Sequence, residues 1–212
     1  MKLAFSPLLA AVALAGAAGA STGAPAPASA STAPDWQGIA TANDRKRLRQ
    51  WRTAWTQALS KAVASGHATE IAREGTLLQP DAALDWQQPP PGLYACRTIK
   101  IGAKPNGMLD YVAYPAFDCR IRSEDGLLSF AKLTGSQRPI GLLFPYTGER
   151  MVFLGTLQLG DETRALQYGD DQERDLAALV EHVGDKRWRL VFPYPHFESI
   201  VDVIELTPKV GQ

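Results

Sequence analysis

Two stretches of the sequence resemble each other and decide how the chain folds: Tyr94-Ala95-Cys96-Arg97-Thr98-Ile99-Lys100 and Phe117-Asp118-Cys119-Arg120-Ile121-Arg122. Each has an aromatic residue, one variable residue, then Cys and Arg, with aliphatic and basic residues after them. Short runs of aromatic and β-branched residues are typical of strands. We therefore expect two strands that carry the only two cysteines of the chain at matching positions.

The two cysteines, Cys96 and Cys119, are predicted to form a disulfide. Matched contexts in a chain with an export signal favour a disulfide over a nucleophile. Zinc would need further ligands, and none cluster beside these cysteines in the sequence. The bond would close a loop of about 24 residues and stabilise the fold by about 3.4 kcal/mol through loop entropy.

The residues after Pro89-Pro90-Pro91-Gly92 have the pattern of an antiparallel sandwich or barrel. Three consecutive prolines end any helix or central strand, and beyond them the apolar period is two. Strands are expected at about 93–101, 111–122 with a break at Pro115, 127–133, 138–145, 150–159, 177–183, 187–193 and 199–207. Residues 170–183 also fit a helical spacing, so strand and helix both remain open there.

The inside of the predicted barrel can be hollow or filled. A barrel of eight strands has room for one small ligand or for its own side chains. Large apolar side chains favour a filled core, and the inward candidates are Phe130, Phe144, Phe153, Trp188 and Phe192.

A helical front, residues 35–86, precedes the strands. Thr41 offers a cap for one helix that runs to about Ser65, where Gly66 can stop it. The apolar stripe of this helix comprises Leu48, Trp51, Trp55, Ala58, Leu59, Ala62 and Val63. The basic residues between them are expected on a solvated face.

The first 34 residues are expected to serve export. Met1-Lys2, an apolar run and Ala18-Gly19-Ala20 have the features of a signal peptide over residues 1–20. Residues 21–34 contain only Ser, Thr, Gly, Ala and Pro, the composition of a flexible linker. The sequence predicts a periplasmic or secreted protein with no stable membrane insertion after cleavage.

The charge balance argues against nucleic acid as a partner. The chain has 22 Lys and Arg against 22 Asp and Glu, and signal removal takes away only Lys2. Proteins that bind nucleic acid use an excess of basic residues.

The turn stretch Lys132-Leu133-Thr134-Gly135-Ser136-Gln137-Arg138-Pro139 is one candidate ligand site. Lys132, Gln137 and Arg138 combine an ammonium, a planar amide and a guanidinium, which can bind a carboxylate or phosphate. The structural alternative is a hairpin in which Arg138 pairs with a neighbouring acid.

Arg97 and Arg120 are the second candidate, because they occupy matching places in the twin stretches. If their strands pair, both guanidinium groups can share one anion site. The alternative is that Asp202, and also Glu205, neutralise them inside the fold.

Signals for catalysis, metal or cofactor binding are weak. His196 beside Glu198 and Ser199 supplies the residue types of a hydrolase triad, but the sequence contains no Gly-x-Ser-x-Gly. The three histidines are far apart in sequence. We therefore predict no catalytic residues, no metal and no cofactor.

Four motifs resemble an exported family of Gram-negative bacteria catalogued only as a domain of unknown function. They are Gly92-x-Tyr94-x-Cys96-Arg97-x-Ile99-Lys100-x-Gly102, the stretch Lys132 to Pro139, Phe153-Leu154-Gly155 and Arg187-Trp188-Arg189-Leu190-Val191. The resemblance covers about Trp36 to Pro208. It implies export and a helix-then-β layout, and it brings no activity.

The fold class expected is α+β: an N-terminal helical segment, then an antiparallel, about eight-stranded, lipocalin-like barrel over residues 92–208 with one disulfide. Lipocalin-type barrels include small periplasmic protease inhibitors, but this chain has a long helical front and no free N-terminal arm. The leading function is a non-enzymatic periplasmic protein that binds a small molecule or envelope component. The alternatives are an interaction module, such as a hydrolase inhibitor, and thirdly a hydrolase.

Overall fold

The computed structural model describes residues 34–105, 107 and 109–209. The expected signal peptide and the linker up to residue 33 lie outside the described residues. The helical front comprises α1 (Trp36–Ile39), α2 (Ala42–Arg49), α3 (Trp51–Ala64), α4 (Ala68–Arg73) and the 3-10 helix η1 (Gly75–Leu78). None of the described helices has the length and apolar character needed to cross a bilayer.

The single helix expected from Thr41 to Ser65 is two helices. Its ends are as predicted, since the Thr41 hydroxyl accepts a hydrogen bond from the Asp44 amide at 3.1 Å, and Gly66 has φ +93°. The prediction missed a bend at Gln50, whose φ and ψ of −95° and 9° are not those of a regular helix. The bend lets α2 pack on one part of the barrel and α3 on another.

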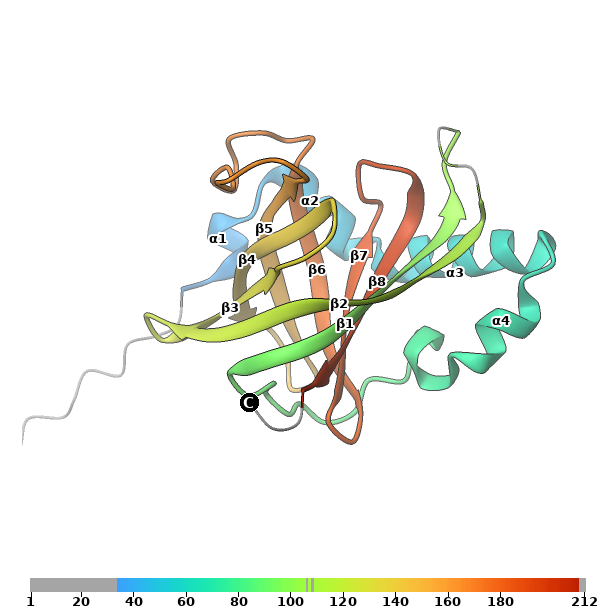
Figure 1. The fold of residues 1–212 in the computed structure, drawn as a ribbon, viewed down its shortest axis with the longest axis horizontal. Coiled ribbons are helices and arrows are strands. Elements are labelled where there is room, and N and C mark those ends of the chain that lie inside the picture. The colour runs from blue at the N-terminus through green and yellow to red at the C-terminus, as the bar shows by residue number, and fades with distance from the viewer. Residues whose placement is uncertain (1–33, 106, 108, 210–212) are drawn as a thin grey trace, which may run out of the picture. The chain divides into compact units, whose positions relative to one another are not determined.

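Eight strands form a closed antiparallel barrel in sequence order, and β8 pairs with β1 (Figure 1). The strands are β1 (Gly92–Ala103), β2 (Tyr111–Glu124), β3 (Leu127–Lys132), β4 (Gln137–Pro145), β5 (Arg150–Leu159), β6 (Asp175–Gly184), β7 (Arg187–Pro193) and β8 (Ser199–Pro208). The ambiguous segment is therefore a strand from Asp175 onward. The predicted fold class is confirmed, with short helices as the N-terminal part.

Pro115 bends β2 and does not end it. Arg97 pairs with Ala116 and Ile99 with Ala113, so β2 has one more residue than β1 between these pairs. A bulge of this kind tolerates proline, which has no N–H to give to the ladder.

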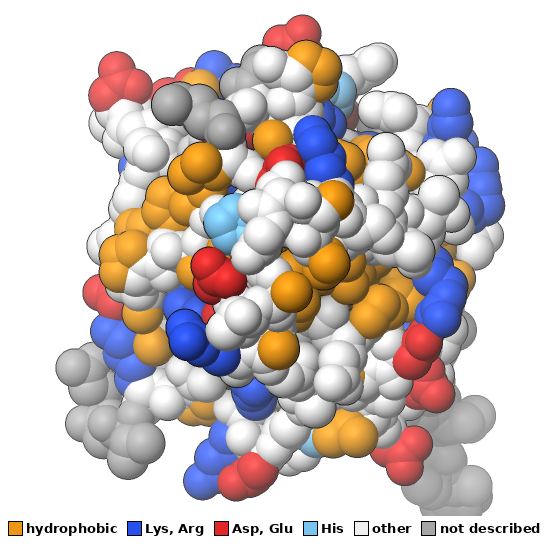
Figure 2. All heavy atoms as spheres, turned by 90° about the vertical axis from the view of Figure 1, so that its right-hand side faces the viewer, with side chains coloured by type: hydrophobic (Ala, Val, Ile, Leu, Met, Phe, Trp, Pro, Cys, Tyr) orange, Lys and Arg blue, Asp and Glu red, His pale blue; other side chains and the backbone are white. Residues whose placement is uncertain are grey.

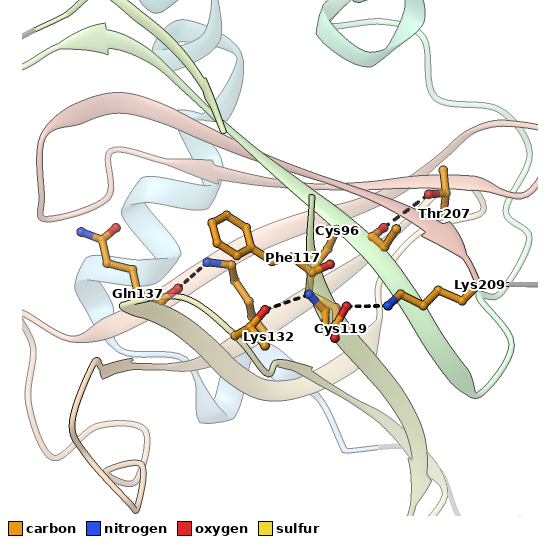
Figure 3. Close-up of a disulfide and its surroundings, with 10 residues drawn as sticks. Cys96, Phe117, Cys119, Lys132, Gln137, Thr207 and Lys209 are labelled. Atoms are coloured by element: carbon orange, nitrogen blue, oxygen red, sulfur yellow. Dashed lines mark hydrogen bonds and ion pairs between the residues drawn. A yellow bond between two sulfur atoms is a disulfide. The ribbon is translucent and has the colours of Figure 1, made fainter. Parts of the chain in front are cut away.

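The predicted disulfide joins β1 to β2. Cys96 and Cys119 are bonded with their Cα atoms 5.8 Å apart, and both are fully buried. They lie on the inward faces of the two strands, beside Phe117 and Lys132 (Figure 3).

Alternate residues of the strands fill one part of the barrel interior. Phe130, Phe153, Trp188 and Phe192 belong to this core, as expected. Phe144 does not: it points outward and packs with Trp36 and Leu48 of the helical front. The prediction for Phe144 was wrong because the outer face of β4 is also apolar where it meets the front.

The helical front covers part of the outer barrel surface. Trp55 and Ala58 of α3 pack against Ile99, Val201 and neighbouring residues on β1, β7 and β8. The helical front and the barrel together form one compact unit.

The segment between the front and β1, residues 79–91, closes one end of the barrel. The amides of Leu84 and Trp86 donate to the carbonyls of His182 and Gly148 at 2.9 and 3.0 Å. The Trp188 indole donates to the Gln87 carbonyl at 2.6 Å, and Trp86 packs on the core. This end is therefore occupied by the chain itself.

Candidate functional site

The other end of the barrel holds a cavity of about 440 Å³. It lies at the end of the strands where the β1–β2, β3–β4, β5–β6 and β7–β8 connections meet. Its apolar walls are Phe117, Leu157, Leu176, Phe192 and Ile204. The rim is completed by Gly135 and Ser136 of the β3–β4 connection with Gln137 at the start of β4, and by Pro195–Glu198 of the β7–β8 connection. Pockets that hold small ligands have volumes of this order.

A paired cation and two acids lie on one side of the cavity. The Lys100 ammonium donates to Asp202 at 3.0 Å and lies 3.3 Å from Glu198. Asp202 also accepts from the Ser199 hydroxyl. Burial alone would lower the pKa of Lys100, but the two carboxylates outweigh it and raise that pKa. Lys100 thus stays charged and has its counter-charges within the protein.

Lys132 is the second cation of the cavity, and it has no such partner. Its ammonium lies 3.7 Å from the centre of the Phe117 ring and donates to the Gln137 carbonyl at 2.9 Å (Figure 3). Among the described residues, no carboxylate lies within ion-pair distance of it. Burial, together with the positive charges of Lys100 and Arg138, lowers the pKa of Lys132 to about 8.

The β3–β4 connection folds tightly over Lys132. A Cβ atom on Gly135 would meet the Phe117 ring at 2.9 Å and the Lys132 ammonium at 3.0 Å, and Gly135 has φ +89°. Only glycine satisfies both conditions without a shift of the neighbours. The sequence Lys132 to Gln137 therefore places the ammonium within this turn.

Arg138 fixes the same connection from outside the cavity. Its guanidinium donates to the carbonyls of Gly135, Gly160, Leu159 and Glu162 at 2.9–3.1 Å. These bonds tie the β3–β4 turn to the end of β5. This geometry fits the alternative prediction, in which Arg138 has a structural role. Its partners are backbone carbonyls and not the acidic side chain that was expected.

Arg97 and Arg120 do not meet. Arg97 pairs with Glu205 at 2.9 Å and with Glu74 of the front at 2.8 Å, on the outer surface. Arg120 is opposite Leu93, four positions from Arg97 along β1, and lines a groove outside β2, β3 and β4. The alternative prediction was that Asp202 and Glu205 neutralise these arginines. Glu205 does pair with Arg97, whereas Asp202 pairs with Lys100.

Gln137 and Lys132 are the predicted site residues that line the cavity. Sequence reasoning missed the roles of Lys100 and Phe117. Lys100 follows Tyr94, Cys96 and Thr98 at a period of two, which was the available signal for an inward side chain. Phe117 precedes Cys119 and Ile121 at the same period of two, which was the corresponding signal.

The parts of a hydrolase triad are near one another but are not connected as a triad. Ser199 is hydrogen-bonded to Asp202 and to the Phe197 carbonyl. The Nε2 atom of His196 is buried and has no hydrogen-bond partner among the described residues. Burial, with Arg47 and Lys104 nearby, lowers the pKa of His196.

Within the described part of the chain, no group of three or more His, Cys, Asp and Glu is arranged to hold a metal ion. On the face shown in Figure 2, acidic, basic and apolar side chains are interspersed.

The family model described as Domain of unknown function (DUF4893) matches residues 36–206. The match covers most of the chain, so the chain belongs to this family. Searches of curated proteins and of solved structures gave no match.

Proposed function

We propose that this DUF4893 protein is a non-enzymatic binding protein that holds a small molecule in the open end of its barrel. The observation that carries the proposal is the cavity of about 440 Å³, which is bounded by strands and by two connections. Concave sites with apolar walls and a few polar groups are the usual form of ligand pockets.

The arrangement of the connections supports a small ligand over a protein partner. A protein partner would be expected to contact connections that project from the barrel. Here Gly135–Gln137 and Pro195–Glu198 line the cavity with their own residues. The four core aromatics fill only part of the interior, so space remains at this end.

Native mass spectrometry of the full chain, produced with its signal in a Gram-negative host, tests the proposal. We expect a retained small molecule that is lost in Leu176→Trp, which fills the cavity, and kept in Leu166→Trp, whose site is 43% exposed. A ligand that binds both variants equally, or no ligand at all in the wild type, would contradict it.

Export to the periplasm belongs to the same proposal, since residues 1–20 have the composition of a signal peptide and the disulfide suits an oxidising compartment. We expect the protein in the periplasmic fraction to begin at Ser21. N-terminal sequencing checks this, and an intact Met1 in the cytoplasmic fraction would oppose it.

The second candidate is an interaction module. A groove of about 390 Å³ outside β2, β3 and β4, with Arg120 and Arg122 beside Leu133, supports it. The test is copurification of a partner protein. A protein that copurifies with the wild type and with Leu176→Trp, but not with Arg120→Glu/Arg122→Glu, would indicate that this groove is the functional site.

A further inference from the structure

We propose that the ligand is an amphipathic molecule with a single carboxylate, which pairs with the ammonium of Lys132. This inference rests on the proposed function, because it assigns the ligand class of the same cavity.

The first step of the argument is the difference between the two cations. Lys100 has two carboxylates within 3.3 Å, whereas the polar contact of Lys132 is one neutral carbonyl. Lys132 is only 6% exposed, so water does little to solvate its charge. A buried ammonium without a counter-charge is unfavourable, and an anion from outside would remove that cost.

The second step is that the ammonium is held in place before a ligand arrives. The Phe117 ring, the Gln137 carbonyl and Gly135 surround it, and Arg138 ties down the connection that carries two of these residues. The Cys96–Cys119 bond joins the strands beneath, where Cys119 is directly opposite Lys132 (Figure 3). Preorganised groups bind with a smaller loss of entropy.

The third step concerns the charge and shape of the ligand. Asp202 and Glu198 line the same cavity and would repel a second negative charge, so a monoanion fits better than a dianionic phosphate. The apolar residues Leu157, Leu176, Phe192 and Ile204 form the inner wall and suit a hydrocarbon or aromatic body.

The test compares 2-naphthoate with 2-naphthamide, which have the same ring system and differ in charge. Isothermal titration calorimetry at pH 7 measures both affinities for the full mature protein. We expect wild type to bind the carboxylate at least about tenfold more tightly, the usual effect of a charged hydrogen bond. Lys132→Met should bind the two probes within about twofold of each other.

Lys209→Met is the matched control, because it removes an ammonium that binds Asp118 on the surface and leaves the cavity unchanged. It should keep the wild-type preference. Circular dichroism confirms that each variant is folded.

The outcomes separate the ligand class from the binding function. If Lys132→Met keeps the preference, or wild type binds the amide as tightly as the acid, the carboxylate assignment fails. If the amide binds wild type but not Leu176→Trp, the cavity would still be supported as the binding site. If wild type binds neither probe, the proposed ligand class is contradicted. The proposal that the cavity holds a small molecule is then tested separately by native mass spectrometry.

Discussion

At the scale of single residues, Lys132 should make the free energy of unfolding depend on pH. The pKa of Lys132 is lowered to about 8 in the fold, because the side chain is buried and lies near the positive charges of Lys100 and Arg138. The carboxylates of Asp202 and Glu198 pair with Lys100. The unfolded chain, with an ordinary lysine pKa of about 10.4, binds more protons between these values. Stability therefore rises with pH in that window.

We predict that Lys132→Met stabilises the protein at pH 7, by up to about 3 kcal/mol. The advantage is fully present below pH 8 and should disappear as the pH approaches the lysine pKa of the unfolded chain. Urea unfolding of both proteins at pH 7 and at pH 10 measures it. An equal difference at the two pH values would show that Lys132 is not desolvated in the fold.

Sequence patterns predicted the positions of some site residues and not of others, and the reason differs from residue to residue. The cysteines could be paired because only two exist, in matched contexts. Lys132 and Gln137 could be assigned to one turn. Whether Arg97 and Arg120 meet depended on the register of β1 against β2, which places Arg97 opposite Ala116 and Arg120 opposite Leu93, and matched sequence contexts do not specify that offset.

At the scale of elements, the β3–β4 connection depends on Arg138. Arg138→Ala should lower the free energy of unfolding by about 2 kcal/mol, because four carbonyl oxygens lose a charged donor. Equilibrium unfolding in urea measures the change. Arg122→Ala, an exposed arginine on β2, is the control and should stay within about 0.5 kcal/mol of wild type. A fully stable Arg138→Ala that no longer binds carboxylates would instead make Arg138 a recognition residue.

Most of the strands were predictable because apolar residues recur at a period of two between turn residues. β6 was ambiguous because it is buried on both faces, against the core and against the helical front, and so shows no such alternation. The bend at Gln50 was not predictable, since the apolar stripe of α2 and α3 continues through it without interruption. The bend coincides with a change of packing partner, since α2 packs on β6 and α3 on β1, β7 and β8.

At the scale of the whole molecule, the sequence indicated a helical front but not how it joins the barrel. Arg189 alternates with inward residues of β7 and so belongs to the outer face, yet it is fully buried. Its guanidinium pairs with Glu181 at 2.6 Å and donates to the carbonyls of Thr76, Leu77, Gln79 and Pro80. An outward arginine is normally solvated, and only the contact with η1 reveals this role.

Arg189→Met should therefore loosen the front from the barrel and cost about 3–5 kcal/mol, the effect of leaving buried partners unpaired. Arg187→Met is the matched control on the same face of β7, because Arg187 is partly exposed and its pair with Glu205 should contribute about 1 kcal/mol or less. Urea unfolding measures both, and hydrogen exchange should show lost protection in Gly75–Leu78 for Arg189→Met alone. Equal, small losses in the two variants would mean that apolar packing around Trp55 holds the front without Arg189.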